Sequence, residues 1–154
     1  MKTVIAITAA GLVSLGIVGA TPAAAYHLIP ESTNFTGTGN TSATKSGVTL
    51  ACKAKFTGSI DDKGVGSVTG GSFSGELGCS SVGLSGLPWK ATAKKAAKGV
   101  ISGVTFTSPI GNCGPSDLPV KLKNGTISFT NAAISGGCTI TGKIKTKPTV
   151  SIVP

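Results

Sequence analysis

Residues 67–79 read SVTGGSFSGELGC, and residues 128–138 repeat this pattern, two residues shorter, as SFTNAAISGGC. Each copy contains a serine, an apolar residue, a threonine, three small or polar residues, a second apolar residue and a serine–glycine pair, and each ends on a cysteine. Each copy also has a cysteine upstream, with Cys52 lying 27 residues before Cys79 and Cys113 lying 25 residues before Cys138. Because repeated sequence indicates repeated structure, the chain is predicted to contain two similar β units.

All four cysteines of the chain belong to this repeat. Four cysteines allow three pairings, of which the repeat favours Cys52–Cys79 and Cys113–Cys138. No pair has the Cys-x-x-Cys spacing that zinc binding and dithiol redox chemistry prefer. We therefore expect the cysteines to form structural disulfides in an oxidising compartment.

The segments around the repeat alternate apolar and polar residues. Between residues 48 and 56, one face carries Val48, Leu50, Cys52, Ala54 and Phe56, and the other carries Lys53 and Lys55. Residues 139–147 alternate in the same way, with Ile140 and Ile144 opposite Lys143, Lys145 and Lys147. A period of two with one apolar face predicts half-buried strands.

Turn residues separate these strands. Asn124-Gly125 is a strong hairpin signal, and residues 94–98 are too few for a stable helix, so they predict a hairpin tip. Within the first copy of the repeat, Val68 and Phe73 fall on opposite faces unless a bulge at Gly70-Gly71 restores the phase. We predict an all-β fold, a disulfide-stabilised β-sandwich or flattened barrel of about eight or nine short strands.

The chain divides into three segments. Residues 1–25 combine an early lysine, an apolar stretch and the small residues Ala23-Ala24-Ala25, which predicts a cleaved signal peptide. Residues 26–44 are rich in Ser, Thr, Asn and Gly and predict an extended N-terminal arm. Residues 45–154 predict a single β domain with two pseudo-repeated disulfide units. No later segment is apolar enough to span a bilayer, so we expect a secreted protein, extracellular or at the cell surface.

Positive charge dominates the surface chemistry. The formal net charge is +9, and every basic residue is a lysine. Arginine is the residue that reads phosphates and base edges bidentately, so its absence argues against specific nucleic-acid recognition. Lys53, Lys55, Lys143 and Lys145 are candidate contacts to anionic cell-surface or matrix polymers. The alternative is that outward lysines only prevent edge-to-edge aggregation of strands.

Candidate catalytic groups are sparse. A hydrolase needs a nucleophile with a base held in hydrogen-bond reach, and the single histidine, His27, lies in the polar arm. We therefore predict no catalytic residue, no metal site and no cofactor. Trp89, after Pro88, is a candidate platform for acyl chains or sugars, although the favoured interpretation is that it fills one end of the β fold.

Several landmarks occur in a characteristic order along the chain. They are Asn34-Phe35-Thr36, Leu50-Ala51-Cys52-Lys53-Ala54, Ser72-Phe73-Ser74-Gly75 before Cys79, Gly86-Leu87-Pro88-Trp89, Cys113-Gly114-Pro115-Ser116, and the final Cys138. This set resembles the alkane oxidation protein activator family of exported bacterial proteins. The resemblance extends to about Gly142, and it carries no catalytic residues.

The resemblance implies a secreted, non-enzymatic surface protein that promotes alkane or other hydrocarbon utilisation, by emulsification or cell-surface contact, and biofilm formation. The alternative is a structural subunit of an extracellular fibre or adhesin that self-associates by β-strand exchange. Residues 26–44 and 149–153 discriminate between the two, because strand exchange requires one of them to leave its own domain. We expect removal of residues 149–154 to weaken self-association more than it lowers the melting temperature.

Overall fold

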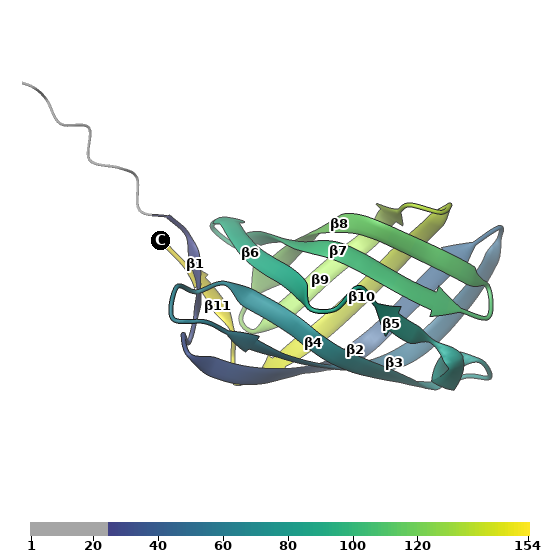
Figure 1. Cartoon of the computed structure of the whole chain (residues 1–154), viewed down its shortest axis with the longest axis horizontal. Helices are drawn as coiled ribbons and strands as arrows, with labels where there is room; N and C mark the ends of the chain where they lie inside the picture. Colours follow the sequence, from purple (N-terminus) through teal and green to yellow (C-terminus); the bar gives the residue numbers. More distant parts are fainter. Residues whose placement is uncertain (1–24) are drawn as a thin grey trace, which may run out of the picture.

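The computed structural model describes residues 25–154, which form a closed all-β barrel (Figure 1). Its eight wall strands are β2 (Thr33–Lys45), β3 (Val48–Ile60), β4 (Gly66–Gly75), β6 (Trp89–Lys95), β7 (Lys98–Ser108), β8 (Gly111–Lys123), β9 (Thr126–Ile134) and β10 (Cys138–Lys147). A short strand, β5 (Gly83–Ser85), pairs with β7 beyond the end of β6, and a 3-10 turn, η1 (Cys79–Ser81), precedes it. The predicted signal peptide lies outside the described residues except for Ala25.

The wall closes because β7 pairs with both of its neighbours in the chain. The sheet runs β7–β6–β4–β3–β2–β10–β9–β8, and the additional β7–β8 pairing joins its two ends. Every neighbouring pair of strands is antiparallel, so the chain follows an up-and-down meander. The predicted all-β class is confirmed, and of the two predicted architectures the structure is the barrel.

Residues 33–44, which we predicted as part of an extended arm, instead belong to a full wall strand, β2. Strand β2 pairs with β3 from Thr33 opposite Ile60 to Lys45 opposite Val48, and with β10 on its other side. The strand lacks the expected apolar alternation because glycines occupy inward positions. A Cβ on Gly37 would lie 2.7 Å from Cγ2 of Ile144, so neighbouring side chains already fill that space. The predicted boundary between an arm and a domain at residue 45 is therefore wrong.

Both copies of the sequence repeat contain a bulge at equivalent positions. In β4 the register shifts between Val68 and Gly70, and in β9 it shifts between Phe129 and Ala132. One extra residue changes which face the following side chains occupy. Val68 and Phe73 consequently both face the barrel interior, as predicted, although the extra residue is Thr69 and so comes just before the predicted Gly70-Gly71. The repeat thus encodes two wall strands with the same irregularity.

A two-stranded ribbon closes one end of the barrel, at the left of Figure 1. It consists of β1 (His27–Ile29) and β11 (Ser151–Val153), with Leu28 opposite Ile152. Leu28 and Val150 are buried against Ile60 and Leu122. The C-terminal segment therefore packs on its own domain, which contradicts our expectation that removing it affects self-association more than stability.

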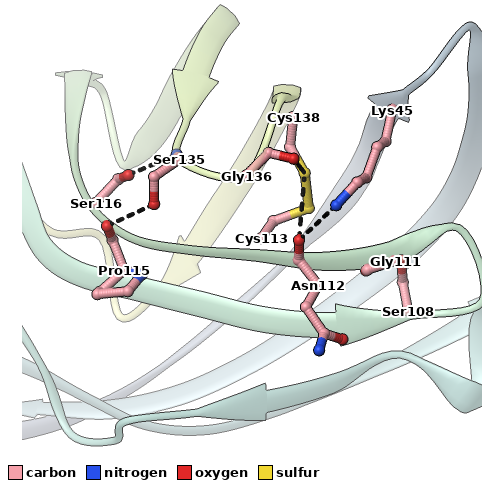
Figure 2. Close-up of a disulfide and its surroundings, with 10 residues drawn as sticks. All are labelled: Lys45, Ser108, Gly111, Asn112, Cys113, Pro115, Ser116, Ser135, Gly136 and Cys138. Carbon is pink, nitrogen blue, oxygen red and sulfur yellow. Dashed lines mark hydrogen bonds between the residues drawn. A yellow bond between two sulfur atoms is a disulfide. The ribbon is translucent and has the colours of Figure 1, made fainter.

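Two disulfides staple the barrel with the predicted pairing. Cys52–Cys79 and Cys113–Cys138 span Cα–Cα distances of 5.7 and 6.0 Å. Around the second disulfide, Ser135 donates its backbone N–H to Oγ of Ser116 at 2.8 Å and its hydroxyl to the carbonyl of Pro115 at 2.9 Å (Figure 2). The side-chain contacts and the disulfide hold β8 to the β9–β10 turn.

Replacing Cys113 and Cys138 by serine is expected to lower the free energy of unfolding by about 3 kcal/mol, because the reduced chain regains the loop entropy that a crosslink of this span removes. Chemical denaturation of the purified oxidised protein measures the change. The Cys52→Ser/Cys79→Ser variant is a matched comparison, since the two loops span 25 and 27 residues. An unchanged free energy in both variants would contradict the entropic role.

Candidate apolar binding cavity

The barrel interior collects nearly all of the aromatic side chains. All five phenylalanines and the single tryptophan line one internal cavity: Phe35, Phe56, Phe73, Phe106, Phe129 and Trp89. Aliphatic side chains from every wall strand complete the lining, among them Ala43, Ile60, Val68, Ala91, Val104, Leu122, Ile127 and Ile144. Side chains along each strand point alternately into and out of the barrel, and these residues occupy the inward positions. The barrel geometry therefore directs them into one interior space.

The cavity encloses about 150 Å³, and almost every atom that faces it is carbon. Two of the polar side chains that line it pair with backbone groups. Nε1 of Trp89 donates to the carbonyl of Ser85 at 2.9 Å, and Oγ1 of the buried Thr146 donates to the carbonyl of Gly125 at 2.9 Å and accepts the N–H of Val150. Among the described residues no buried side-chain nitrogen or oxygen lacks a partner. The cavity therefore presents very little polar surface to a ligand.

The aromatic rings are held by close local packing. Phe56 and Phe73 meet edge to face, with ring centroids 5.7 Å apart and planes at 87°. Phe129 lies over Gly142, where a Cβ would overlap the ring. Such contacts fix ring orientation, so the cavity has a defined shape.

Apolar side chains close both ends of the barrel. At one end the terminal ribbon contributes Leu28 and Ile152. At the other, the Cys52–Cys79 disulfide packs with Leu50 and is flanked by Phe73 and Val82. A ligand in the cavity would therefore contact apolar side chains at both ends as well as along the wall.

The wall itself has two places where backbone pairing is short. Strand β4 pairs with β6 only from Gly66 to Val68, and β8 pairs with β9 only from Lys121 to Lys123. The Cys113–Cys138 disulfide bridges the second of these places. We call the first of these places the β4–β5 seam, because the side chain of Leu84 in β5 lies there against Gly71 in β4. Side chains rather than a hydrogen-bond ladder thus complete the wall there.

The predicted site residues fall into two separate groups. Trp89 is only 5% exposed and lines the cavity, so it is not a surface platform. Lys53, Lys55, Lys143 and Lys145 are exposed on the outer face of β3 and β10. Sequence reasoning missed the cavity, although one signal was present: in the alternating strand at residues 48–56, Phe56 falls on the apolar face.

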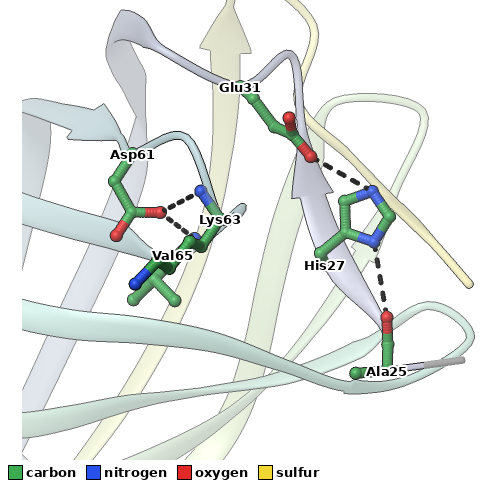
Figure 3. A network of polar contacts seen from close by, with 6 residues as sticks. All are labelled: Ala25, His27, Glu31, Asp61, Lys63 and Val65. Carbon is green, nitrogen blue, oxygen red and sulfur yellow. Dashed lines mark hydrogen bonds and ion pairs between the residues drawn. The ribbon is translucent and has the colours of Figure 1, made fainter.

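The acidic side chains and the histidine that make polar contacts lie outside the barrel interior. Nε2 of His27 lies 3.4 Å from Glu31 on the terminal ribbon (Figure 3). The carboxylate of Asp61 accepts the backbone N–H groups of Val65 at 2.8 Å and Lys63 at 2.9 Å, and the bond from Val65, followed by that from Lys63, lowers its pKa. Between residues 25 and 154, no three His, Cys, Asp or Glu side chains gather as a metal site would require.

The comparisons with known proteins identify one family. The model described as alkane oxidation protein activator PraA/PraB-like matches residues 1–154, the whole chain. Neither a curated protein nor a solved structure matches the chain. In the part of the chain that the structure describes, no helix has the length and apolar character needed to cross a membrane.

Proposed function

Because this chain belongs to the PraA/PraB-like alkane oxidation protein activator family, we propose that its barrel binds a hydrocarbon in the internal cavity and so promotes the use of alkanes. The observation that carries this proposal is the cavity itself, which is lined almost entirely by carbon. Hydrocarbon binding needs no directional partner, since each buried CH₂ contributes about 0.8 kcal/mol through the hydrophobic effect.

The size of the cavity sets the size of the ligand. An apolar cavity of about 150 Å³ in another protein stays dry and binds benzene, a molecule of six carbons. The cavity here has a similar volume, about 150 Å³. It therefore suits a short alkane of roughly six carbons, or one segment of a longer chain.

We place this binding in an exported, non-enzymatic protein that brings hydrocarbon to the cell surface and contributes to biofilm formation. Two disulfides support export, because they persist in oxidising compartments. The single histidine pairs with Glu31 outside the barrel, which supports a role without catalysis.

Surface contact is favoured over direct emulsification. A protein that coats oil droplets presents a contiguous apolar patch, whereas the large apolar side chains found exposed between residues 25 and 154 are Val48 and Leu77 alone. Strand exchange into a fibre is also less favoured. Both segments that could donate a strand, residues 26–44 and 149–153, pair or pack within their own chain.

Hexane binding tests the proposal, with Trp89 as the reporter because it is the only tryptophan and lines the cavity. We expect a saturable change in Trp89 fluorescence during titration with hexane. Replacing Ala43 by leucine fills part of the cavity and should weaken binding roughly tenfold or more. Ala51→Leu makes the same chemical change at an exposed position on β3 and should leave binding unchanged. Failure of hexane to saturate the wild-type signal would exclude the proposed ligand.

A further inference from the structure

We infer that the outer face of β10, β2 and β3 binds an anionic polysaccharide, independently of the cavity. The strand register places four lysines at the corners of a rectangle on this face. Lys143 lies opposite Asn40 and Asn40 opposite Lys53, and one step along, Lys145 lies opposite Thr38 and Thr38 opposite Lys55. We call these four lysines the lysine rectangle.

The register fixes the dimensions of the lysine rectangle. Neighbouring strands lie about 4.8 Å apart, so lysines on β10 and β3 are about 10 Å apart at the backbone. Lysines on one strand are two residues apart, which is about 7 Å. The same rows continue around the wall, because Lys121 aligns with Lys143 through Ser128, and Lys123 aligns with Lys145 through Thr126. Positive charge therefore recurs at a regular interval across five strands.

Hydrogen-bonding side chains occupy the positions between the lysines. Thr38 and Asn40 lie midway between the lysines of β10 and those of β3, and Ser72 and Ser74 lie beside Lys55 and Lys53. Together with the lysines of β3, these four residues line a shallow depression. Small hydroxyl and amide groups suit the hydroxyls of a sugar, and lysines suit the carboxylates that recur along an acidic chain.

The charge of this face is not neutralised within the described protein. The ion pair that the structure contains joins His27 to Glu31, on the terminal ribbon rather than on the lysine rectangle. Closely spaced like charges raise the local potential and attract a polyanion. Protection of a sheet edge does not explain them, because β10, β2 and β3 are paired on both sides in a closed wall.

The composition of the face favours a polysaccharide over a nucleic acid. Proteins that bind single-stranded nucleic acid stack bases on aromatic side chains and use arginine. The chain has no arginine, and all five phenylalanines and Trp89 line the interior. Lysines separated by Ser, Thr and Asn remain, which matches a polymer recognised by its carboxylates and hydroxyls.

Binding to polygalacturonate, measured by calorimetry, tests the inference. The rectangle variant carries Lys53→Gln, Lys55→Gln, Lys143→Gln and Lys145→Gln. The matched control carries Lys63→Gln, Lys90→Gln, Lys94→Gln and Lys95→Gln, which removes the same charge from other exposed positions. We expect the rectangle variant to bind roughly tenfold more weakly or worse at low salt, and the control to lose less than about threefold.

Three outcomes would overturn the inference. The first is an equal loss of affinity in the two variants, which would mean that net charge alone drives adsorption. The second is tighter binding of single-stranded DNA than of polygalacturonate. The third is no binding of polygalacturonate by the wild-type protein. Hexane titration of the rectangle variant should match the wild type, since no lysine lines the cavity. The two proposals can therefore fail independently, because hexane titration tests the cavity and polygalacturonate binding tests the lysine rectangle.

Discussion

Deletion of residues 149–154 is expected to lower the free energy of unfolding by about 3–5 kcal/mol, an amount comparable to the loss of one large core side chain. Val150 is only 4% exposed and packs with Leu28, Ile60 and Leu122. The deletion also removes the partner of β1 and the N–H that Thr146 accepts. The remaining apolar side chains at this end would then face water.

Thermal melts and chemical denaturation measure this effect. Deletion of Pro154 alone is the control, because Pro154 is exposed and lies outside β11. We also expect sedimentation of the truncated protein to show no loss of an oligomer. A preserved melting temperature with changed self-association would contradict the packing role and restore the strand-exchange interpretation.

The second large effect concerns ligand polarity. We expect hexane to bind roughly 30-fold or more tightly than 1-hexanol, when each affinity is measured for transfer of the dissolved ligand from water into the cavity. Burial of a hydroxyl without a partner costs about 2 kcal/mol or more, and each 1.4 kcal/mol corresponds to about tenfold in affinity. The surface of the cavity is almost entirely carbon, so few partners are available to offset that cost. A protein with this preference would carry an alkane and release its oxidation product.

A pair of substitutions at Val104 makes the polarity test specific. Val104 is buried and lines the cavity, and threonine has nearly the same shape as valine. Val104→Thr supplies a hydroxyl and should lower the ratio of hexane affinity to 1-hexanol affinity. Val104→Ala enlarges the cavity without adding a polar group and should leave this ratio unchanged. Equal affinities of the wild type for hexane and 1-hexanol would mean that the ligand hydroxyl reaches water.

Local sequence signals predicted the local structure well. Asn124 and Gly125 both adopt positive φ in the β8–β9 turn, as the hairpin signal requires. Residues 94–98 form the tip between β6 and β7 rather than a helix. The repeat predicted both disulfides. These features depend on a few adjacent residues or on a pattern that occurs twice, so they can be recognised from one sequence.

Features that depend on distant segments were not predictable in the same way. Strand β2 was missed because Gly37 occupies a position where an apolar residue would normally mark the inward face. The ribbon pairs Leu28 with Ile152, residues at opposite ends of the described chain. Closure of the wall also requires β2 to pair with β10, which lies about a hundred residues further along the chain. The cavity exists because the aromatic rings from different strands do not fill the barrel completely. The alternation of apolar and polar residues along a strand does not specify the volume that remains empty.

The β4–β5 seam has a kinetic consequence. Because Leu84 rather than a β ladder completes the wall beside Gly71, we expect rotation of that side chain to be enough to open the wall there. Rotation of a side chain takes picoseconds to nanoseconds, whereas collective rearrangement takes microseconds or longer. We therefore expect the seam to set the residence time of a bound alkane, so that loading and unloading proceed quickly from a barrel whose backbone stays folded.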